Sequence, residues 1–304
     1  MEKGGRPLAV ELLGVVKDFG SVRALDSLDL TVRQGEVVAL LGPNGAGKTT
    51  AINIMVGLRR PTRGSARLFG LDPRDRRART LCGVMLQDVS LPPNLKVTEM
   101  IRLFSACYPA SLPGTHLLEV SGLVGRSAAL IGTLSAGERQ RLFYALAICG
   151  DPCLLFLDEP SVGMDVEGRR AFWENIHRIA ARGSTIVLTT HYLEEAEAIA
   201  ERVVVLKQGR VIADGTPEVL KGKIPSRRLR FEFVEPPVNG LFEGLSIQSV
   251  RLDNSHATIL TDDPEAVLER MFQRRYRVRD IEVVGASLEE AFVELTSLDE
   301  VSRV

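Results

Sequence analysis

Residues 37–50 read VVALLGPNGAGKTT, and this stretch decides the fold. Its first five residues are all apolar, which is typical of a strand that is buried on both faces of a parallel sheet. The remainder has the spacing Gly-x-x-x-x-Gly-Lys followed by Thr, a glycine-rich loop that leads into a helix. Glycines let backbone N–H groups turn toward an anion, and the helix N-terminus adds partial positive charge. The stretch therefore predicts a strand at Val37–Leu41, a phosphate-binding loop, and a helix at Lys48–Leu58.

A second apolar run, residues 154–159, reads LLFLDE and ends in two carboxylates. Open α/β sheets bind ligands at the edge where their parallel strands end, so Asp158 and Glu159 are expected beside the phosphate-binding loop. Asp158 and the Thr49 hydroxyl can then hold magnesium, Lys48 can reach the terminal phosphates, and Glu159 can polarise a water as general base. The alternative, a strand followed by a solvated acidic turn, is disfavoured by the loop next to it.

Residues 1–220 alternate short apolar runs with longer amphipathic stretches, a pattern that predicts an α/β domain with a mainly parallel sheet. Further strands are predicted at Leu154–Leu157, Thr185–Thr189 and Arg202–Leu206, and further helices at Gly137–Cys149, Glu167–Ala181 and Leu193–Ala200.

The composition and the hydrophobic pattern of the sequence change near Lys221. Residues 221–226, KGKIPS, have the composition of a linker, and the segments that follow predict a small α+β domain. Its elements are predicted as a strand at Arg227–Glu235, a hairpin of Ser246–Leu252 and Ala257–Thr261, a helix at Pro264–Gln273 and a strand at Ile281–Val284. We expect one domain over residues 1–222 and an accessory or dimerisation domain over residues 223–304.

Composition excludes several classes of protein. The 38 Lys and Arg nearly cancel the 39 Asp and Glu, so the net charge of -1 gives no field that recruits nucleic acid, and no nucleic-acid partner is expected. No uncharged stretch is long and apolar enough for a spanning helix, and no apolar segment near the N-terminus predicts a secretory signal. The four cysteines are expected to be thiols in a cytosolic chain, and Cys149 and Cys153 are expected to be buried.

Residues 134–141, LSAGERQR, identify a family. They resemble the LSGGQ signature of the ATP-binding cassette (ABC) family, the nucleotide-binding subunits of ABC transporters, and the resemblance covers roughly residues 8–220. Ser135 offers a hydroxyl, Gly137 exposes a backbone amide, and the helix that follows points its N-terminus at an anion. A plain helix cap, with Ser135 and Glu138 forming a capping box, is the alternative, and both can hold together.

The resemblance implies a phosphate-loop NTPase cassette with ATP and Mg²⁺ as ligands and a helical subdomain at about residues 88–136. It implies that Phe19 stacks on adenine, that Gln87 senses magnesium and the attacking water, that Asp165 belongs to a loop at the dimer interface, and that His191 contacts the γ-phosphate. The sequence departs from the family consensus at Ala136, where glycine is usual, and at Glu138, where glutamine is usual. It also departs from it at Val162, Met164 and Val166 in the interface loop.

The expected site residues fall into three groups. The catalytic group is Lys48, Gln87, Glu159 and His191. The magnesium group is Thr49, Gln87 and Asp158. The nucleotide-binding group is Phe19, Gly42, Pro43, Asn44, Gly45, Ala46, Gly47, Lys48, Thr49, Thr50, Ser135, Ala136, Gly137, Glu138 and Asp165.

The family resemblance also implies partners. Two copies would pack head to tail with ATP between the phosphate loop of one and the signature of the other, and a separate membrane permease would hold the chain peripherally at the cytoplasmic face of the cell membrane. Residues 92–98 resemble the surface that grips the permease, and SLEEAFVELT at residues 287–296 resembles the C-terminal wording of drug-resistance-type export cassettes. Export is therefore expected, with an importer cassette or a non-transport ABC ATPase as alternatives. A local concentration of arginines between Arg59 and Arg79 is interpreted as a solvated face, with a lipid or permease contact as the alternative.

Overall fold

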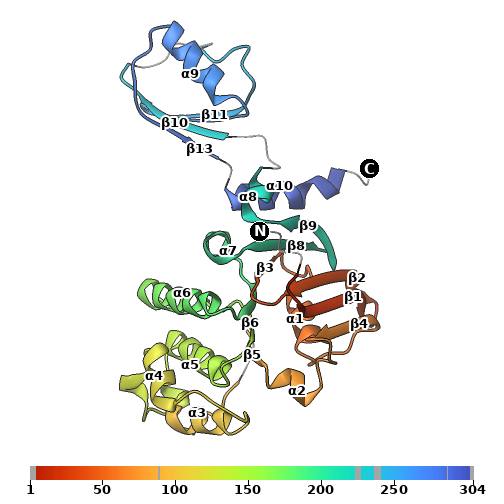
Figure 1. Ribbon diagram of the computed structural model, residues 1–304. Coiled ribbons are helices and arrows are strands. Elements are labelled where there is room, and N and C mark those ends of the chain that lie inside the picture. The colour runs from red at the N-terminus through yellow and green to blue at the C-terminus, as the bar shows by residue number, and fades with distance from the viewer. Residues whose placement is uncertain (1–4, 88–89, 223–226, 236–240, 286, 302–304) are drawn as a thin grey trace. The chain divides into compact units, whose positions relative to one another are not determined.

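The computed structural model describes residues 5–87, 90–222, 227–235, 241–285 and 287–301 (Figure 1). The chain forms two compact units, of which unit 1 ends at Thr216 and unit 2 begins at Pro217. Most of the linker-like segment at residues 221–226 lies outside the described residues.

A six-stranded sheet forms the centre of unit 1. Its strand order is β5-β6-β7-β3-β8-β9, and every neighbouring pair is parallel except β8 and β9. All residues of β3, β6 and β7 are buried, as their continuous apolar sequences predict for strands covered on both faces. The strands are β3 (Val37–Leu41), β5 (Cys82–Met85), β6 (Leu154–Asp158), β7 (Thr185–Thr189), β8 (Arg202–Lys207) and β9 (Arg210–Gly215). The expected α/β cassette with a mainly parallel sheet is confirmed.

A three-stranded antiparallel sheet, in the order β2-β1-β4, was not predicted from the sequence. Its strands are β1 (Leu8–Phe19), β2 (Val22–Arg33) and β4 (Arg63–Leu68). Several register shifts interrupt the pairing of β1 with β2, and these bulges break the strict alternation by which a half-buried strand is recognised. Apolar side chains of this sheet share one buried cluster with helix α1 (Lys48–Met55) and with β3 and β6. Ala46 of the phosphate loop belongs to the same cluster, which thereby anchors the loop to the core of unit 1.

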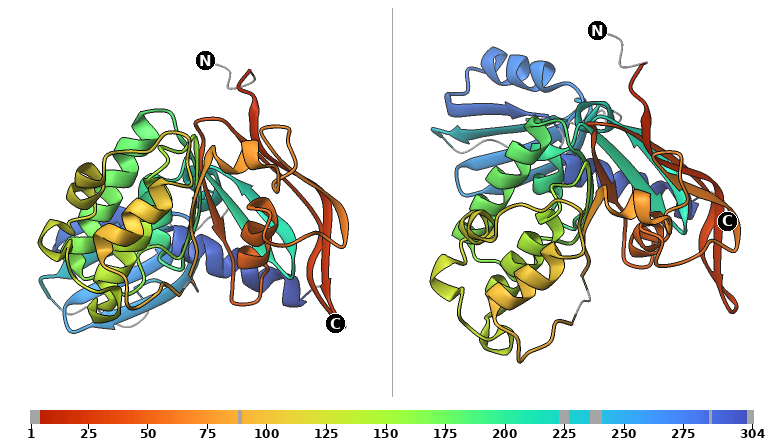
Figure 2. Two further views of the ribbon diagram at one scale, coloured as in Figure 1. Left: turned by 90° about the horizontal axis from the view of Figure 1, so that it is seen from below. Right: turned by 60° about the horizontal axis from the view of Figure 1, so that its bottom comes forward.

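The helices that lie between β5 and β7 in the chain cover the side of the six-stranded sheet opposite α1 and the antiparallel sheet (Figure 2). Between β5 and β6 the chain forms α3 (Val97–Ser105), α4 (Gly114–Val120) and α5 (Ala136–Ile148). The short α2 (Arg76–Arg79) precedes β5 and contributes Ala78 to the cluster that contains α1. Two further helices, α6 (Val166–Ala181) and α7 (Leu193–Ile199), follow β6 and β7.

Helix α1 is shorter than the sequence predicted, because it ends at Met55 rather than at Leu58. Gly57 follows with φ +74°, a left-handed conformation that ends helices and suits glycine. A Cβ atom there would lie 2.7 Å from the carbonyl oxygen of Pro73, so only glycine fits the turn.

Unit 2 contains a four-stranded antiparallel sheet in the order β11-β12-β10-β13. One face carries a buried apolar cluster that includes Phe231, Ile259 and Met271, the last from helix α9. The predicted hairpin and the predicted helix are both present, and β13 begins three residues earlier than expected, at Val278. The elements are α8 (Pro217–Lys221), β10 (Arg227–Phe233), β11 (Ile247–Asp253), β12 (His256–Thr261), α9 (Pro264–Gln273), β13 (Val278–Val284) and α10 (Leu288–Val301).

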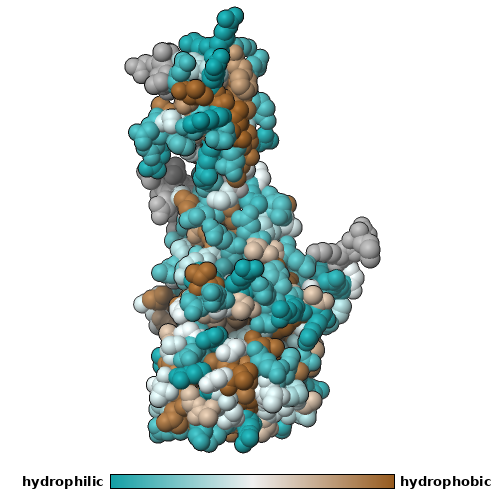
Figure 3. All heavy atoms as spheres, turned by 90° about the vertical axis from the view of Figure 1, so that its left-hand side faces the viewer, coloured by the Kyte–Doolittle hydropathy of each residue, from teal (hydrophilic) through white to brown (hydrophobic). Residues whose placement is uncertain are grey.

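The two edge strands of this sheet expose apolar side chains. Figure 3 shows hydrophobic side chains at the surface of unit 2, and the exposed apolar residues of the edge strands are Val250, Leu252, Ile281, Val283 and Val284. Open edges that carry apolar side chains are surfaces on which sheets pair with other chains.

All four cysteines are free thiols, but they are not all buried. Cys82 and Cys149 are buried, whereas Cys107 and Cys153 are exposed, so the expectation for Cys153 was wrong. Cys153 precedes the first buried residue of β6, outside the covered part of the strand. Among the residues that the structure describes, no cluster of His, Cys, Asp and Glu could hold a metal, and no helix has the length and apolar character needed to cross a bilayer.

Candidate active site

The phosphate loop lies in a narrow space between β2 and β8. A Cβ atom on Gly47 would lie 2.6 Å from the Ala24 carbonyl oxygen, and one on Gly42 would lie 2.4 Å from the Leu206 carbonyl oxygen. Gly47 also has φ +103°, a backbone conformation that residues other than glycine rarely adopt. Both glycines are therefore required by the close approach of the backbone.

Lys48 points back over this loop. Its Nζ donates hydrogen bonds to the carbonyl oxygens of Gly42, at 2.6 Å, and Pro43, at 3.3 Å. Burial lowers the pKa of Lys48, and the negative charges of Glu159 and Asp158 oppose that shift. The ammonium is thus held between the loop and the carboxylates at the end of β6.

A cleft of about 680 Å³ brings together most of the expected residues from distant parts of the chain. Those that line it are Phe19, Asn44, Gly45, Ala46, Gly47, Lys48, Thr49, Thr50, Gln87, Glu159 and His191. Gly42, Pro43, Asp158, Ser135, Ala136, Gly137, Glu138 and Asp165 are not part of its lining.

Phe19 ends β1 at the rim of the cleft, with 44% of its surface exposed. Lys17 Nζ lies 5.0 Å from the centre of the ring and the Arg59 guanidinium lies 5.9 Å from it. An exposed aromatic ring flanked by two cations offers a face for a flat base that is attached to an anionic chain.

Asp158 is almost fully buried beneath the loop, with 1% of its surface exposed. Thr189 Oγ1 donates a 2.6 Å hydrogen bond to Asp158 Oδ1, whereas Oδ2 is buried without a hydrogen-bond partner among the described residues. Burial raises the pKa of Asp158, and hydrogen bonds from Thr189 and Thr49 counteract that rise. A buried carboxylate oxygen without a partner fits a cation, because it is otherwise costly to bury.

Glu159 has an unusual backbone conformation for its residue type, with φ +52°. Its N–H donates to both the carbonyl oxygen and the Oγ1 of Thr189, at 3.2 and 3.1 Å, which holds the strained residue in place. Its Oε2 lies 2.6 Å from His191 Nδ1 and accepts a 3.3 Å hydrogen bond from the His191 backbone N–H. The strained turn therefore aims the carboxylate at the cleft and pairs it with His191.

The signature segment begins helix α5 and is a capping box. Ser135 Oγ accepts the N–H of Glu138 at 3.2 Å, and Glu138 Oε2 accepts the N–H of Ser135 at 2.8 Å. Arg126 Nε lies 2.9 Å from the other oxygen of Glu138, so the carboxylate that replaces the family's glutamine is paired with a cation. The cap and the anion-binding interpretation remain compatible, since the amide of Gly137 is not used by the cap.

Ala136 and Asp165 lie in segments of unit 1 that touch each other. A Cβ atom on Gly163 would lie 3.5 Å from the Ala136 Cβ, and one on Gly137 would lie 3.2 Å from the Gly163 carbonyl oxygen. Asp165 caps α6 by accepting the Gly168 N–H at 2.7 Å. The Ala136 methyl group therefore packs toward the loop that carries Asp165.

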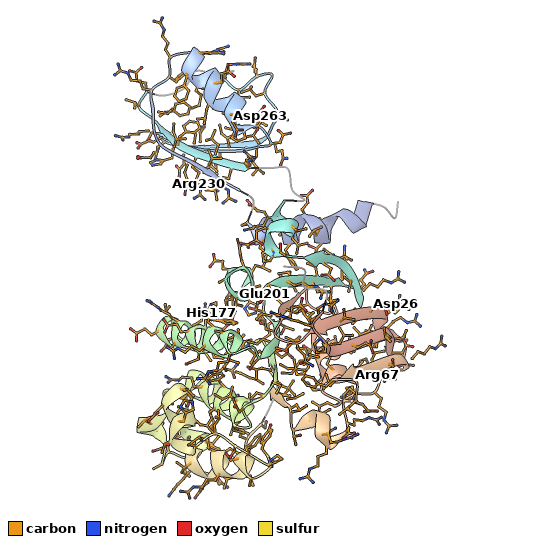
Figure 4. All side chains as sticks on the ribbon, viewed as in Figure 1. Asp26, Arg67, His177, Glu201, Arg230 and Asp263 are labelled. Atoms are coloured by element: carbon orange, nitrogen blue, oxygen red, sulfur yellow. The ribbon has the colours of Figure 1, made fainter. Side chains whose placement is uncertain are left out.

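Several residues of the cleft have no motif by which the sequence could have revealed them. Val22, Arg23 and Ala24 line it from the start of β2. Arg23 forms ion pairs with Asp18 and with Asp26, and Asp26 also accepts a hydrogen bond from Arg210. Figure 4 labels Asp26, which lies on β2. These residues enter the cleft through the antiparallel pairing of β1 with β2, which the sequence analysis did not predict.

The arginines between Arg59 and Arg79 are not part of the cleft lining, and all are exposed. Arg74 pairs with Asp72 at 2.6 Å and Arg77 pairs with Asp75 at 2.7 Å. Their exposure and local pairing agree with the interpretation as a solvated face.

Comparison with known proteins gives close relatives over nearly the whole chain. Nod factor export ATP-binding protein I of Burkholderia lata is 36% identical over 300 residues, covering 94% of this chain and 96% of that protein. Daunorubicin resistance ATP-binding protein DrrA2 of Streptomyces coeruleorubidus is 36% identical over 307 residues, covering 95% of each.

Solved structures give the same family. The ATP-binding subunit of an ABC transporter has a TM-score of 0.66 and 29% identity, over 71% of this chain and 92% of that one. A dimeric ATP-binding cassette in a post-hydrolysis state with ADP and Pi has a TM-score of 0.63 and 25% identity, over 68% of this chain and 98% of that one. The sequence model of the ABC transporter family matches residues 25–162, which include the phosphate loop and both carboxylates. Given these relatives and the cleft at the end of its parallel sheet, the chain belongs to the ATP-binding subunits of ABC transporters.

Proposed function

We propose that this chain hydrolyses ATP to drive export of a substrate through a separate membrane permease. The observation that carries the proposal is the Glu159 carboxylate, which the strained end of β6 holds against His191 in the cleft that Lys48 also lines. Export is supported by the names of the relatives, an export ATP-binding protein and a resistance ATP-binding protein.

In this proposal the cleft binds the nucleotide along its length. Phe19 stacks on the adenine, the amides of residues 42–50 and the Lys48 ammonium contact the phosphates, and magnesium is held by Thr49, Gln87 and Asp158. The unpartnered Oδ2 of Asp158 supports this magnesium assignment, since an anionic oxygen is the ligand that magnesium prefers. Bound there, magnesium neutralises charge that develops on the phosphates.

Hydrolysis would begin at Glu159. The carboxylate accepts a proton from a water whose oxygen attacks the γ-phosphorus, the bond to the β-phosphate oxygen breaks, and ADP leaves. His191 holds the carboxylate from one side and donates to the γ-phosphate from the other, and Lys48 stabilises the negative charge of the leaving group.

The proposal requires a second copy of the chain. Ser135, Gly137 and Asp165 lie outside the cleft of their own subunit, although the exposed hydroxyl and amide at the start of α5 are suited to an anion. Two copies packed head to tail place each signature on the other's nucleotide. The dimeric cassette among the similar structures supports association of two copies.

Mixing two inactive variants tests the shared site. In Ser135→Asp the helix cap is kept, because Asp is an equally good N-cap, but a negative charge faces the partner's phosphates. Lys48→Ala removes the phosphate ligand in the other half of the site. Each variant alone should be inactive, and an equal mixture should recover about a quarter of the wild-type rate of phosphate release, since half of its dimers carry one intact site.

Ser135→Asn is the matched control for this experiment, because it keeps the cap without adding charge. It should retain more activity than Ser135→Asp. Full activity of Ser135→Asp alone, or a mixture as inactive as its components, would show that the signature does not act on the partner's nucleotide.

The permease would hold the chain peripherally at the cytoplasmic face of the membrane. Residues 92–96 precede α3, residues 97 and 98 begin its first turn, and most side chains of this segment are exposed or partly exposed. An exposed segment directly after the Gln87 region of the cleft could pass a change at the γ-phosphate to a permease.

Unit 2 would strengthen association of two copies through its apolar edge strands. Leu252→Lys on β11 and Val283→Lys on β13 should each weaken self-association of the full-length chain about tenfold or more, because a buried apolar side chain of this size contributes about 1.5–3 kcal/mol. Sedimentation equilibrium measures this change.

Ser249→Lys provides the matched control on β11. Ser249 is exposed and pairs with Leu260, whereas Leu252 pairs with Ala257 and so faces the opposite side of the sheet. Association constants that are equal for all three variants and the parent chain would refute a role of these edges in dimerisation.

A further inference from the structure

Glu195 is a buried carboxylate that neither the signature nor the phosphate loop includes. It lies on α7, one turn after His191, and only 8% of its side chain is exposed. Burying a carboxylate costs several kcal/mol unless it is compensated by hydrogen bonds or a cation. Its surroundings therefore need an explanation.

Two hydroxyl groups from different loops donate to the same oxygen of Glu195. Ser161 Oγ lies 2.9 Å from Oε2, and Thr190 Oγ1 also lies 2.9 Å from it. Ser161 belongs to the segment 160–165, which follows Glu159 and ends at Asp165, whereas Thr190 directly precedes His191. One carboxylate oxygen thus joins the loop after β6 to the loop after β7.

The other oxygen is only partly compensated. Glu195 Oε1 lies 3.7 Å from Arg169 Nε, and both atoms are buried without a hydrogen-bond partner among the described residues. The Arg169 guanidinium lies 4.5 Å from the centre of the Tyr192 ring, which in turn lies 4.0 Å from the His191 ring. An incompletely satisfied buried pair is more typical of a functional contact than of one that only stabilises the fold.

These contacts form a continuous connection from the segment 160–165 to the catalytic pair. It runs from Ser161 through Glu195 to Thr190, and through Arg169 and Tyr192 to His191, whose Nδ1 lies 2.6 Å from Glu159. Because the connection starts in the segment that carries Asp165, a displacement of that segment reaches His191 through side chains in contact.

We propose that Glu195 is a positioning residue that ties the segment 160–165 to His191, so that docking of a second copy sets the position of His191 beside Glu159. This inference rests on the proposed function, in which Asp165 lies at the dimer interface. Glu195 itself does not line the cleft, so it acts through Ser161 and Thr190 rather than on the nucleotide.

Glu195→Gln tests the proposal in the full-length chain. The amide keeps the size of the side chain but removes its charge and replaces one acceptor oxygen by a donor. We expect kcat for ATP hydrolysis to fall about 10²-fold, because a small misplacement of a catalytic group lowers the rate by about that factor. KM for ATP should change less than about twofold. Glu194→Gln, the same change at the exposed neighbouring residue, should leave both constants unchanged.

Two further measurements separate positioning from folding and from the proposed function. In a Glu159→Gln background, Glu195→Gln should still form the ATP-dependent dimer; absence of that dimer with Glu159→Gln alone would count against the proposed function instead. Ser161→Ala should lower kcat in the same way as Glu195→Gln, and the double variant should be no worse than either single variant. Three results would overturn the inference. They are an unchanged kcat in Glu195→Gln, additive losses of kcat in the double variant, and a rise in KM for ATP together with a loss of thermal stability.

Discussion

Replacement of Glu159 by Gln is expected to abolish steady-state ATP hydrolysis while ATP binding persists. Gln has the same shape and can still pair with His191 Nδ1, but it cannot accept the proton of the attacking water. General-base catalysis contributes about 10²–10⁴-fold to the rate, so the rate of phosphate release should fall at least about 10²-fold. Titration with a fluorescent ATP analogue should give an affinity close to that of the parent chain.

The trapped variant also makes the dimer measurable. Size-exclusion chromatography of Glu159→Gln with ATP and magnesium should show a dimer that is not present with ADP, because the γ-phosphate contacts from both copies are retained. Glu194→Gln controls for loss of a carboxylate in the same region and should hydrolyse ATP normally. Near-normal turnover in Glu159→Gln would contradict its assignment as the general base.

Replacement of Lys48 by Ala should instead remove nucleotide affinity itself. The ammonium lies between the loop carbonyl oxygens and the two carboxylates, where burial lowers its pKa and makes each remaining polar contact strong. Losing charge-assisted hydrogen bonds of about 1.5–3 kcal/mol predicts a dissociation constant about tenfold to a hundredfold higher. Equilibrium titration with the fluorescent analogue checks this directly.

Lys96→Ala, on the segment before α3 and outside the cleft, is the matched control and should bind ATP like the parent chain. Lys48 also donates hydrogen bonds to the carbonyl oxygens of Gly42 and Pro43, so its loss could disorder the loop. Thermal unfolding of Lys48→Ala distinguishes such disorder from the loss of the lysine–phosphate contact alone. Unaltered affinity in a folded Lys48→Ala chain would mean that the phosphates bind elsewhere.

The parallel sheet and the phosphate loop could be predicted because each depends on local sequence. Val37–Leu41 is continuously apolar and the loop glycines are fixed by backbone geometry, so pattern and structure coincide there. The cleft residues Gln87 and His191 have no such local signal and became visible only through the family resemblance, although the structure places both at the cleft.

The remainder depends on contacts between segments that are distant in sequence. Arg23 enters the cleft through the bulged pairing of β1 with β2, and Glu195 acquires its partners only when the ends of β6 and β7 become neighbours. A single Glu in an amphipathic helix reads as a solvated charge, and nothing local distinguishes Glu195 from Glu194. The exposure of Cys153 was missed for a similar reason, because Cys153 directly precedes the buried strand β6 and nothing in the local sequence shows that its side chain lies outside the covered part.

The pairing of Arg126 with Glu138 has an evolutionary consequence. A lineage that changed Glu138 to the usual glutamine first would leave the Arg126 guanidinium without its carboxylate, and one that lost Arg126 first would leave an unbalanced anion at a helix start that we propose binds the phosphates of ATP. Either intermediate alters the charge of the signature by one unit, whereas the exchange of both residues alters nothing. We therefore expect the two positions to be epistatic, so that grafting one of the two residues into a related cassette should require grafting the other as well.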